Sequence, residues 1–193
     1  MEPDWSWSIM RPQIIFGEAL GSNMNAIPAL GVYAALLKEA GEPLHWPGGA
    51  AMVSEAVDAD LLGRAIHWTC TAAKARNETF NITNGDVFCI RHLWPAIADA
   101  FGMEVGEPSP LNLTEFMADK ASLWGAIVRK HGLKPYRFDE VVAWPFGDYV
   151  FNTHWDVMSN LTKSRHHGFH DVVDSEDMFV DLLTRFREAR IVP

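Results

Sequence analysis

Cysteine is scarce in this sequence, and several metal and redox centres depend on it. The 193 residues include only two cysteines, Cys70 and Cys89, and neither belongs to a C-x-x-C pair. This spacing excludes zinc and dithiol redox sites that are built on cysteine pairs. Two unpaired thiols are typical of a cytosolic protein in which they stay reduced.

Long apolar runs are also missing. No run approaches the roughly 18 residues that a membrane-spanning helix needs. Residues 1–4 are acidic and lack the basic and apolar regions of a secretory signal peptide. We therefore expect a cytoplasmic protein that has no membrane partner.

Basic residues are fewer than acidic ones, and this balance indicates which kinds of partner the chain can bind. The chain has 16 Lys and Arg against 25 Asp and Glu, so the net charge is -9. A nucleic-acid-binding domain is more often basic, and we expect no nucleic-acid partner. Hydrophobic residues make up 48% of the sequence, which predicts a folded chain of one domain or slightly more.

The stretch that organises the chain is residues 5–17. Ile9-Met10 and Ile14-Ile-Phe16 are short apolar runs on either side of Arg11-Pro12, followed by Gly17. This pattern predicts one buried strand that ends in a loop. Such strands normally lie in parallel sheets covered on both faces, yet the following sequence is mostly helical. We therefore expect the partner strands to lie outside this sequence.

Helical periodicity and end signals divide the rest of the chain. They predict helices over residues 25–40, 60–74, 90–101, 114–131 and part of 138–151, and a final helix from 175. Residues 78–82 alternate like a strand, residues 43–46 are extended, and residues 152–174 are polar and irregular.

Three histidines near the C-terminus are candidates for a metal site. His166, His167 and His170 lie beside Asp171, but the spacing matches no H-E-x-x-H motif and Gly168 breaks the helical register. A structural turn explains the cluster better, and we expect no metal.

A series of motifs, in order, resembles one enzyme family. Trp7-Ser-Ile-Met-Arg-Pro-Gln-Ile-Ile-Phe-Gly17 resembles the W-S-x-x-R-P-x-x-I-F-G segment of extended short-chain dehydrogenases/reductases, which belong with the NAD-dependent epimerases/dehydratases. Within these, the chain most resembles the progesterone 5β-reductase/iridoid synthase-like branch. Later matches are Ser22-x-Met-Asn25, Asp58-Ala-Asp-Leu61, Asn77-Glu-Thr-Phe-Asn81, His92-Leu-Trp94, His167-Gly-Phe169 and Ile191-Val-Pro193.

The resemblance implies an α/β, mostly helical fold with few short strands. It corresponds to the C-terminal, substrate-binding part of a Rossmann-type short-chain dehydrogenase/reductase. Residues 1–17 would be the terminal strand of a dinucleotide-binding domain that is otherwise missing, and residues 18–193 the substrate-binding domain. No G-x-x-G-x-x-G occurs, and Tyr33, Tyr136 and Tyr149 do not match the context of the family's catalytic tyrosine. No catalytic residue is therefore assigned.

The resemblance also suggests contacts with a nicotinamide cofactor, NADP or NAD. In this family the loop after the first matched strand lies beside the nicotinamide ring, which implicates Pro12, Gln13, Ile14, Ser22 and Met24. A plainer interpretation is that Ser22 caps a helix and Met24 packs in the core. Without the glycine-rich loop, we expect this chain alone to bind the cofactor weakly or not at all.

The same resemblance places a substrate loop after residue 150. Apolar side chains of this loop close over an enone, which implicates Phe151, Trp155 and Met158; ordinary core packing is the other interpretation. A hydrophobic ketone or enone needs an apolar wall with few polar anchors.

Two functions remain open at this stage. The first is the substrate-binding portion of an NAD(P)-dependent oxidoreductase that reduces an alkene next to a carbonyl, with epimerase, dehydratase or carbonyl-reductase activity as the nearest variants. The second is a stand-alone, non-catalytic binding or assembly module. Because the strand at residues 8–16 is apolar, we expect a homo-oligomer or pairing with a dinucleotide-binding domain.

Overall fold

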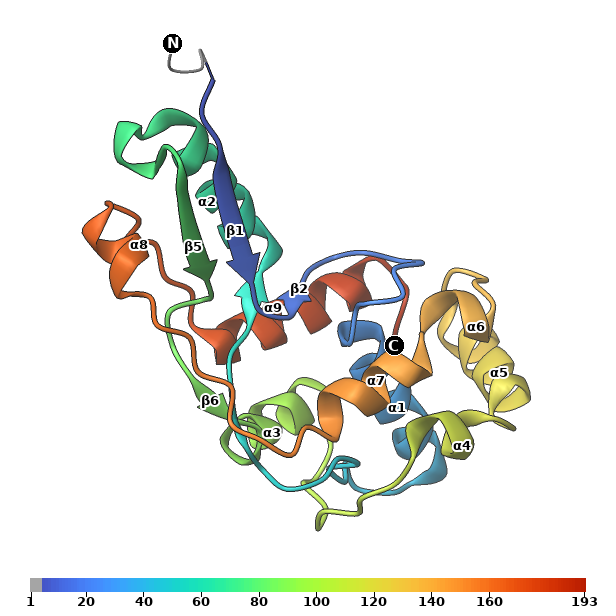
Figure 1. The fold of residues 1–193 in the computed structure, drawn as a ribbon. Coiled ribbons are helices and arrows are strands. Elements are labelled where there is room, and N and C mark those ends of the chain that lie inside the picture. Colours follow the sequence, from blue (N-terminus) through green and yellow to red (C-terminus); the bar gives the residue numbers. More distant parts are fainter. Residues whose placement is uncertain (1–4) are drawn as a thin grey trace.

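The computed structural model describes residues 5–193; the acidic residues 1–4 lie outside the described part. Figure 1 shows a small lobe around strands β1 (Ser8–Pro12) and β5 (Glu78–Ile82), with helices α2 (Ala59–Thr71) and α8 (Thr162–His166) beside them. A larger, helical lobe follows below it. Its helices are α1 (Ile27–Ala40), α3 (Ile90–Ala100), α4 (Leu113–Met117), α5 (Ala121–His131), α6 (Phe138–Val141), α7 (Trp144–Phe151) and α9 (Ser175–Glu188).

The strands of the described chain form three separate pairs. Strand β1 runs parallel to β5, with Ser8 opposite Glu78 and Pro12 opposite Ile82. Strand β2 (Ile15–Phe16) runs parallel to β4 (Val57–Asp58), and β3 (Val53–Ser54) runs antiparallel to β6 (Phe88–Cys89). The result is the predicted α/β fold, mostly helical, with few short strands.

The prediction of one fully buried, unpartnered strand over residues 5–17 is wrong. The chain forms two strands instead, and their partners β5 and β4 lie in the same sequence. Pro12 ends β1, and the backbone then shifts so that the Ile14 carbonyl accepts from the Val57 N–H at 2.9 Å. Strand β1 is also only partly covered, because the Ile9 side chain is 48% exposed.

Helix α1 is the predicted helix over residues 25–40. Pro28 occupies its first turn, where a missing N–H costs little. At its end, Gly41 adopts a left-handed conformation with φ of 75°, and its N–H caps the carbonyls of Leu37 and Lys38. The first eleven residues of α1 are all buried, so the larger lobe is built around this helix.

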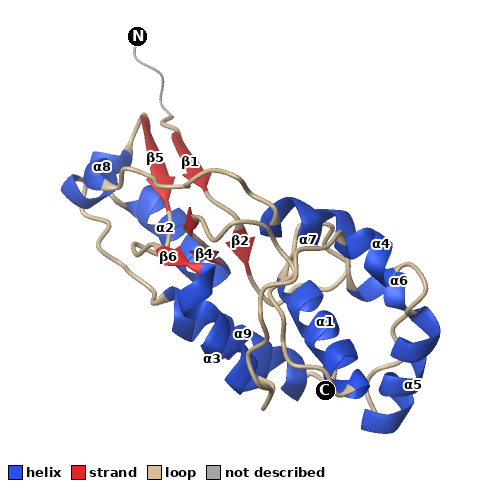
Figure 2. Cartoon of the chain, turned by 90° about the horizontal axis from the view of Figure 1, so that it is seen from below, coloured by secondary structure: helices blue, strands red, loops and turns tan. Residues whose placement is uncertain are grey.

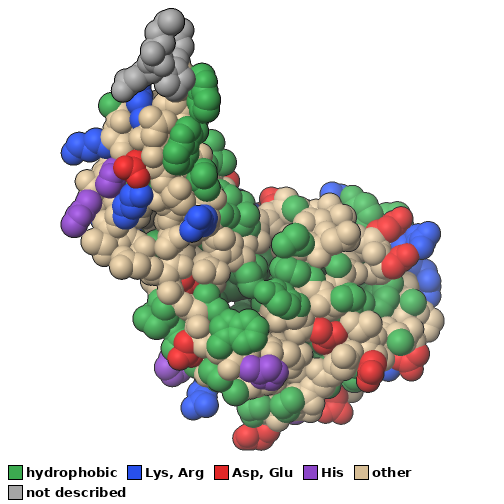
Figure 3. All heavy atoms as spheres, in the orientation of Figure 1, with side chains coloured by type: hydrophobic (Ala, Val, Ile, Leu, Met, Phe, Trp, Pro, Cys, Tyr) green, Lys and Arg blue, Asp and Glu red, His purple; other side chains and the backbone are tan. Residues whose placement is uncertain are grey.

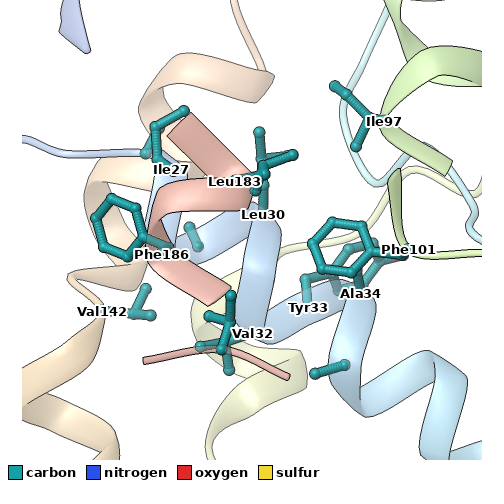
Figure 4. Packing of buried hydrophobic residues seen from close by; sticks show 14 of the residues in the cluster. Ile27, Leu30, Val32, Tyr33, Ala34, Ile97, Phe101, Val142, Leu183 and Phe186 are labelled. Atoms are coloured by element: carbon teal, nitrogen blue, oxygen red, sulfur yellow. The ribbon is translucent and has the colours of Figure 1, made fainter. Parts of the chain in front are cut away.

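The C-terminal helix α9 supplies the other half of that core, as predicted. The Asp174 carboxylate caps it by accepting from the backbone N–H groups of Glu176 and Asp177. Figure 4 shows Leu183 and Phe186 of this helix close to Ile27 and Leu30 of α1. All four side chains are buried, which joins the two ends of the chain in one core.

Two helix predictions need correction. The helix expected over residues 114–131 is divided into α4 and α5, because the chain turns after Met117 and the Lys120 N–H bonds to the Met117 carbonyl. The partial helix over residues 138–151 is likewise divided into α6 and α7. The segment expected to be irregular, 152–174, contains the short helix α8.

The small lobe has a core of its own. Val57, Leu61, Phe80 and Ile82 are buried there, and the ring of Trp68 lies 4.8 Å from that of Phe80 in an edge-to-face arrangement. Figure 2 shows α2 and α8 near the β1–β5 pair. The second of these helices is attached by an ion pair of 2.6 Å between Lys163 and Glu78, which holds the pKa of the Glu78 carboxyl below its usual value.

Among residues 5–193, every helix is too short or too polar to cross a lipid bilayer.

The buried Tyr33 of α1 makes stability sensitive to high pH. Burial raises the pKa of its phenol from 10.0 to about 12. Between these two values the phenol ionises in the unfolded chain but stays protonated in the folded one. The stability that the protonated phenol provides is therefore complete below pH 10.0 and is lost as the pH rises to about 12. In this window we expect the free energy of unfolding to fall by up to about 1.4 kcal/mol per pH unit.

Urea denaturation below and inside the window checks this, with Tyr33→Phe as the matched control. The variant lacks the ionisable group and should lose less stability over the same range. Equal losses in both proteins would show that Tyr33 is not responsible.

Candidate functional site

An apolar cavity of about 410 Å³ lies between the two lobes. Figure 3 shows a hollow where the lobes meet, with hydrophobic side chains around it. Three segments line the cavity: residues 13–16 after β1, residues 50–55 around β3, and residues 149–158 from the end of α7 onwards. Leu30, Phe88 and Phe179 also contribute to the lining.

One wall is an extended segment, residues 152–160, which we call the strap. The strap lies along β3: the Val157 N–H donates to the Val53 carbonyl at 2.9 Å, and the Val53 N–H donates to Asp156 Oδ1 at 3.0 Å. Further along, the Ser159 N–H donates to Glu55 Oε2 at 2.8 Å. These bonds join segments about a hundred residues apart and fix the width of the cavity.

A second part of the lining comes from the residues that follow β1. Gln13 and Ile14 both line the cavity, and Gln13 Nε2 donates to Ser159 Oγ at 3.1 Å. The Gln13 N–H also donates to the Ile82 carbonyl at 3.4 Å, which ties this part of the lining to β5. The end of the parallel pair and the strap thus meet beside the cavity, as expected for ligand sites at the carboxyl ends of parallel strands.

Aromatic contacts make the cavity walls rigid. Phe16 and Phe88 both pack edge-to-face on Phe179, with ring centroids 4.8 and 5.6 Å apart. On the other side, Trp46 packs on Phe151 at 5.2 Å. Such contacts hold the lining in place without adding polar groups, which suits an apolar ligand.

All three residues predicted to bind substrate lie at the cavity. Phe151 is buried in its wall, whereas Trp155 and Met158 are 58% and 70% exposed. Exposed apolar side chains beside a cavity have little to gain from the fold itself. Core packing therefore accounts for Phe151 but leaves Trp155 and Met158 unexplained.

Only some of the residues predicted to bind the cofactor lie at the cavity. Gln13 and Ile14 line the cavity, whereas Pro12, Ser22 and Met24 do not. The Ser22 hydroxyl accepts from the Met24 N–H at 3.3 Å, in the loop before α1, and the Met24 side chain is 69% exposed. Ser22 does not cap α1, because Asn25 Oδ1 accepts from the Ile27 N–H instead, and Met24 does not pack in the core.

Several lining residues were missed by the sequence analysis: Met52, Ser54, Glu55, Phe88 and Tyr149. The segment 50–56 has no periodicity, and no element was predicted for it. Its closeness to the matched motif Asp58-Ala-Asp-Leu61 was the one available signal.

The histidine cluster forms no recognisable metal centre. Within residues 5–193, no group of three or more His, Cys, Asp or Glu side chains is arranged to hold an ion. His167 Nδ1 lies 2.8 Å from the Lys163 carbonyl, and its ring packs edge-to-face on Phe80 at 5.3 Å. This arrangement agrees with the structural turn predicted for these residues.

The fold is that of a Rossmann-type protein of the epimerase/dehydratase kind. The structure is similar to a UDP-glucose 4-epimerase from Thermotoga maritima, with a TM-score of 0.57 and 18% identity over 97% of this chain and 48% of that one. It is also similar to the Bordetella bronchiseptica enzyme WbmG in complex with NAD and UDP, with a TM-score of 0.57, 15% identity and coverage of 99% and 47%.

The sequence belongs to the family described as the PRISE-like Rossmann-fold domain, whose model matches residues 1–193. It is 35% identical to an (S)-8-oxocitronellyl enol synthase from Camptotheca acuminata and 36% identical to one from Antirrhinum majus, each over 97% of this chain. The chain spans about half the length, 50%, of both relatives. These matches confirm the family resemblance inferred from the motifs.

The position of Trp155 and Met158 leads to a prediction. Trp155→Ala and Met158→Ala should each change the free energy of unfolding by less than about 0.5 kcal/mol, because neither side chain is buried. Both should weaken binding of a neutral apolar dye, such as Nile red. Phe151→Ala should instead destabilise the fold by about 3 kcal/mol.

Urea denaturation and dye titration test this prediction, with Trp5→Ala as the matched control, since Trp5 is exposed and does not line the cavity. If Trp5→Ala reduced dye binding as much as Trp155→Ala, the dye would not be reporting on the cavity.

Proposed function

We propose that this chain is the substrate-binding portion of an NAD(P)H-dependent reductase that reduces an activated carbon–carbon double bond next to a carbonyl. The cavity between the strap and the end of β1 carries this proposal. Its lining is dominated by apolar side chains, and its size suits a small hydrophobic ligand. The family membership adds support, since the relatives named above are enol synthases.

This chain offers residues for the nicotinamide end of the cofactor but none for its pyrophosphate. Gln13 and Ile14 follow a parallel strand and line the cavity, which is where the reactive end of a dinucleotide meets its substrate in an α/β sheet. The sequence has no glycine-rich turn that would hold the pyrophosphate at a helix N-terminus. When bound, the nicotinamide would supply hydride to the alkene.

The chain itself would bind and orient the ketone. Trp155 and Met158 would cover its apolar body, and Phe88 and Phe179 would add to the apolar lining. Excluding water in this way strengthens the electrostatic interactions around a developing enolate. The catalytic donors would come from outside this chain. Tyr33 is buried in the core around α1, and Tyr149, although it lines the cavity, does not match the context of the family's catalytic tyrosine, nor does Tyr136.

The missing pyrophosphate site would come from a dinucleotide-binding unit that docks on β1. We propose that residues 1–17 continue that unit's sheet and that residues 18–193 form the substrate-binding domain. Among residues 5–193, β1 pairs only with β5, so its other edge is open to a further strand. Trp7 and Ile9 are exposed in this region, and their burial would add to the docking energy. A second copy of the chain is the other candidate for this edge.

Calorimetry on the 193-residue chain tests both parts of the proposal. We expect saturable binding of carvone, a hydrophobic cyclic enone, and NADPH binding weaker than about 1 mM. Trp155→Ala should weaken carvone binding, and Trp5→Ala should not. Tight binding of NADPH would refute the claim that the pyrophosphate site lies elsewhere, and absent binding of carvone would refute the enone site.

A further inference from the structure

Glu55 is the one charged residue among the buried polar side chains of the described chain. It is 5% exposed, and the other five are neutral: Asn25, Thr83, Asn84, Ser164 and Ser175. It lies between β3 and β4 and contributes to the lining of the apolar cavity. Burying a carboxylate in apolar surroundings is costly unless it is paired or well hydrogen-bonded.

Only one of the two oxygens of this carboxylate accepts a hydrogen bond from the described residues. Oε2 accepts from the Ser159 N–H at 2.8 Å. No group within residues 5–193 donates to Oε1, and no Lys, Arg or His in that range forms a salt bridge with the side chain. The carboxylate therefore retains unused acceptor capacity inside the protein.

The free oxygen faces open space rather than the packed interior. Among the described residues, the only fully enclosed side-chain polar atoms that lack a partner are the indole nitrogens of Trp124 and Trp144. Glu55 Oε1 is therefore not enclosed by protein. Since Glu55 is 5% exposed and contributes to the cavity lining, a ligand in the cavity is placed to reach Oε1.

We propose that Glu55 Oε1 is the polar anchor of the cavity and accepts a hydrogen bond from a hydroxyl group on a hydrophobic ligand. This rests on the proposed function, since it specifies the substrate of the same site as a hydroxylated one. A hydroxyl donor forms a charge-assisted bond with a carboxylate at a modest desolvation cost. An ammonium group would bring a second charge into an apolar site, and a carboxylate ligand would be repelled.

The position of Glu55 also selects the orientation of the ligand. The Ser159 N–H fixes the carboxylate against the strap, and Gln13 Nε2 binds the hydroxyl of the same serine at 3.1 Å. A ligand hydroxyl at Glu55 would therefore set the position of the rest of the molecule relative to Gln13 and Ile14, where the reaction is proposed to occur.

A matched series of ligands tests the proposal by calorimetry on the 193-residue chain. The series consists of decanol, decyl methyl ether, decylamine and decanoate, which share a chain and differ in the polar end. We expect decanol to bind more tightly than the other three. In Glu55→Gln, which keeps the shape and an acceptor for the Ser159 N–H, the ratio of decanol to ether affinity should fall about fivefold.

Two further variants complete the design. Glu55→Leu removes the acceptor and should lower the same ratio about tenfold or more. Glu42→Gln is the control, because Glu42 is exposed and does not line the cavity, and it should leave the ratio unchanged. Circular dichroism and urea denaturation establish whether each variant is folded. If Glu55→Leu does not fold, the result for Glu55→Gln decides whether Glu55 anchors the ligand.

Each other outcome refutes a distinct claim. Equal affinities for decanol and the ether, or an unchanged ratio in Glu55→Gln, would refute the anchoring role while leaving the apolar site intact. Tighter binding of decylamine than of decanol would show a cation site instead. If none of the four ligands bound while carvone did, the anchoring role would be refuted and the proposed function would stand. If carvone also failed to bind, the proposed function would fail with it.

Discussion

The hydrogen bonds that hold the strap against β3 determine whether this chain has a ligand cavity. The Val157–Val53 backbone bond and the Ser159–Glu55 bond join residues 152–160 to the middle of the sequence. Without these bonds the strap would lose its contact with β3. Trp155 and Met158, whose side chains are largely exposed, would then no longer be held beside the cavity. The rest of the fold provides a rigid base for this closure, with α1 and α9 packed together beneath it.

The two lobes have different physical roles. The larger one has an extensive core around α1, which supplies most of the apolar burial that stabilises the chain. The small lobe has a limited core, and β1 leaves Ile9 half exposed and one edge unpaired among the described residues. A lobe of this kind is suited to be completed by another sheet, and the cavity lies where it meets the stable part.

Much of the fold could be predicted because its signals are local. Proline in the first turn and Gly41 at the end identified α1, and Asp174 identified the start of α9. The division of residues 114–131 could not be predicted, because the two helices follow one apolar periodicity. The turn after Met117, closed by the bond from the Lys120 N–H to the Met117 carbonyl, divides them. Asn112 and Asp148 fix the start of α4 by accepting from its first backbone N–H groups, and Asp148 is distant in sequence. For the site, motif resemblance predicted Phe151, Trp155 and Met158, which line the cavity. The burial of Glu55 between two short strands depends on contacts with residues distant in sequence, such as Ser159, and no periodicity announces it.

The central claim is that this chain closes an apolar enone site against a dinucleotide-binding unit. The most direct measurement is NADPH oxidation by a chimera that joins this chain to the half of the Camptotheca acuminata relative that it does not match. We expect enone-dependent oxidation that is weakened by Trp155→Ala and unaffected by Val172→Ala, since Val172 is exposed and belongs to neither the cavity lining nor residues 1–17. A folded chimera that binds NADPH and carvone but transfers no hydride would contradict it.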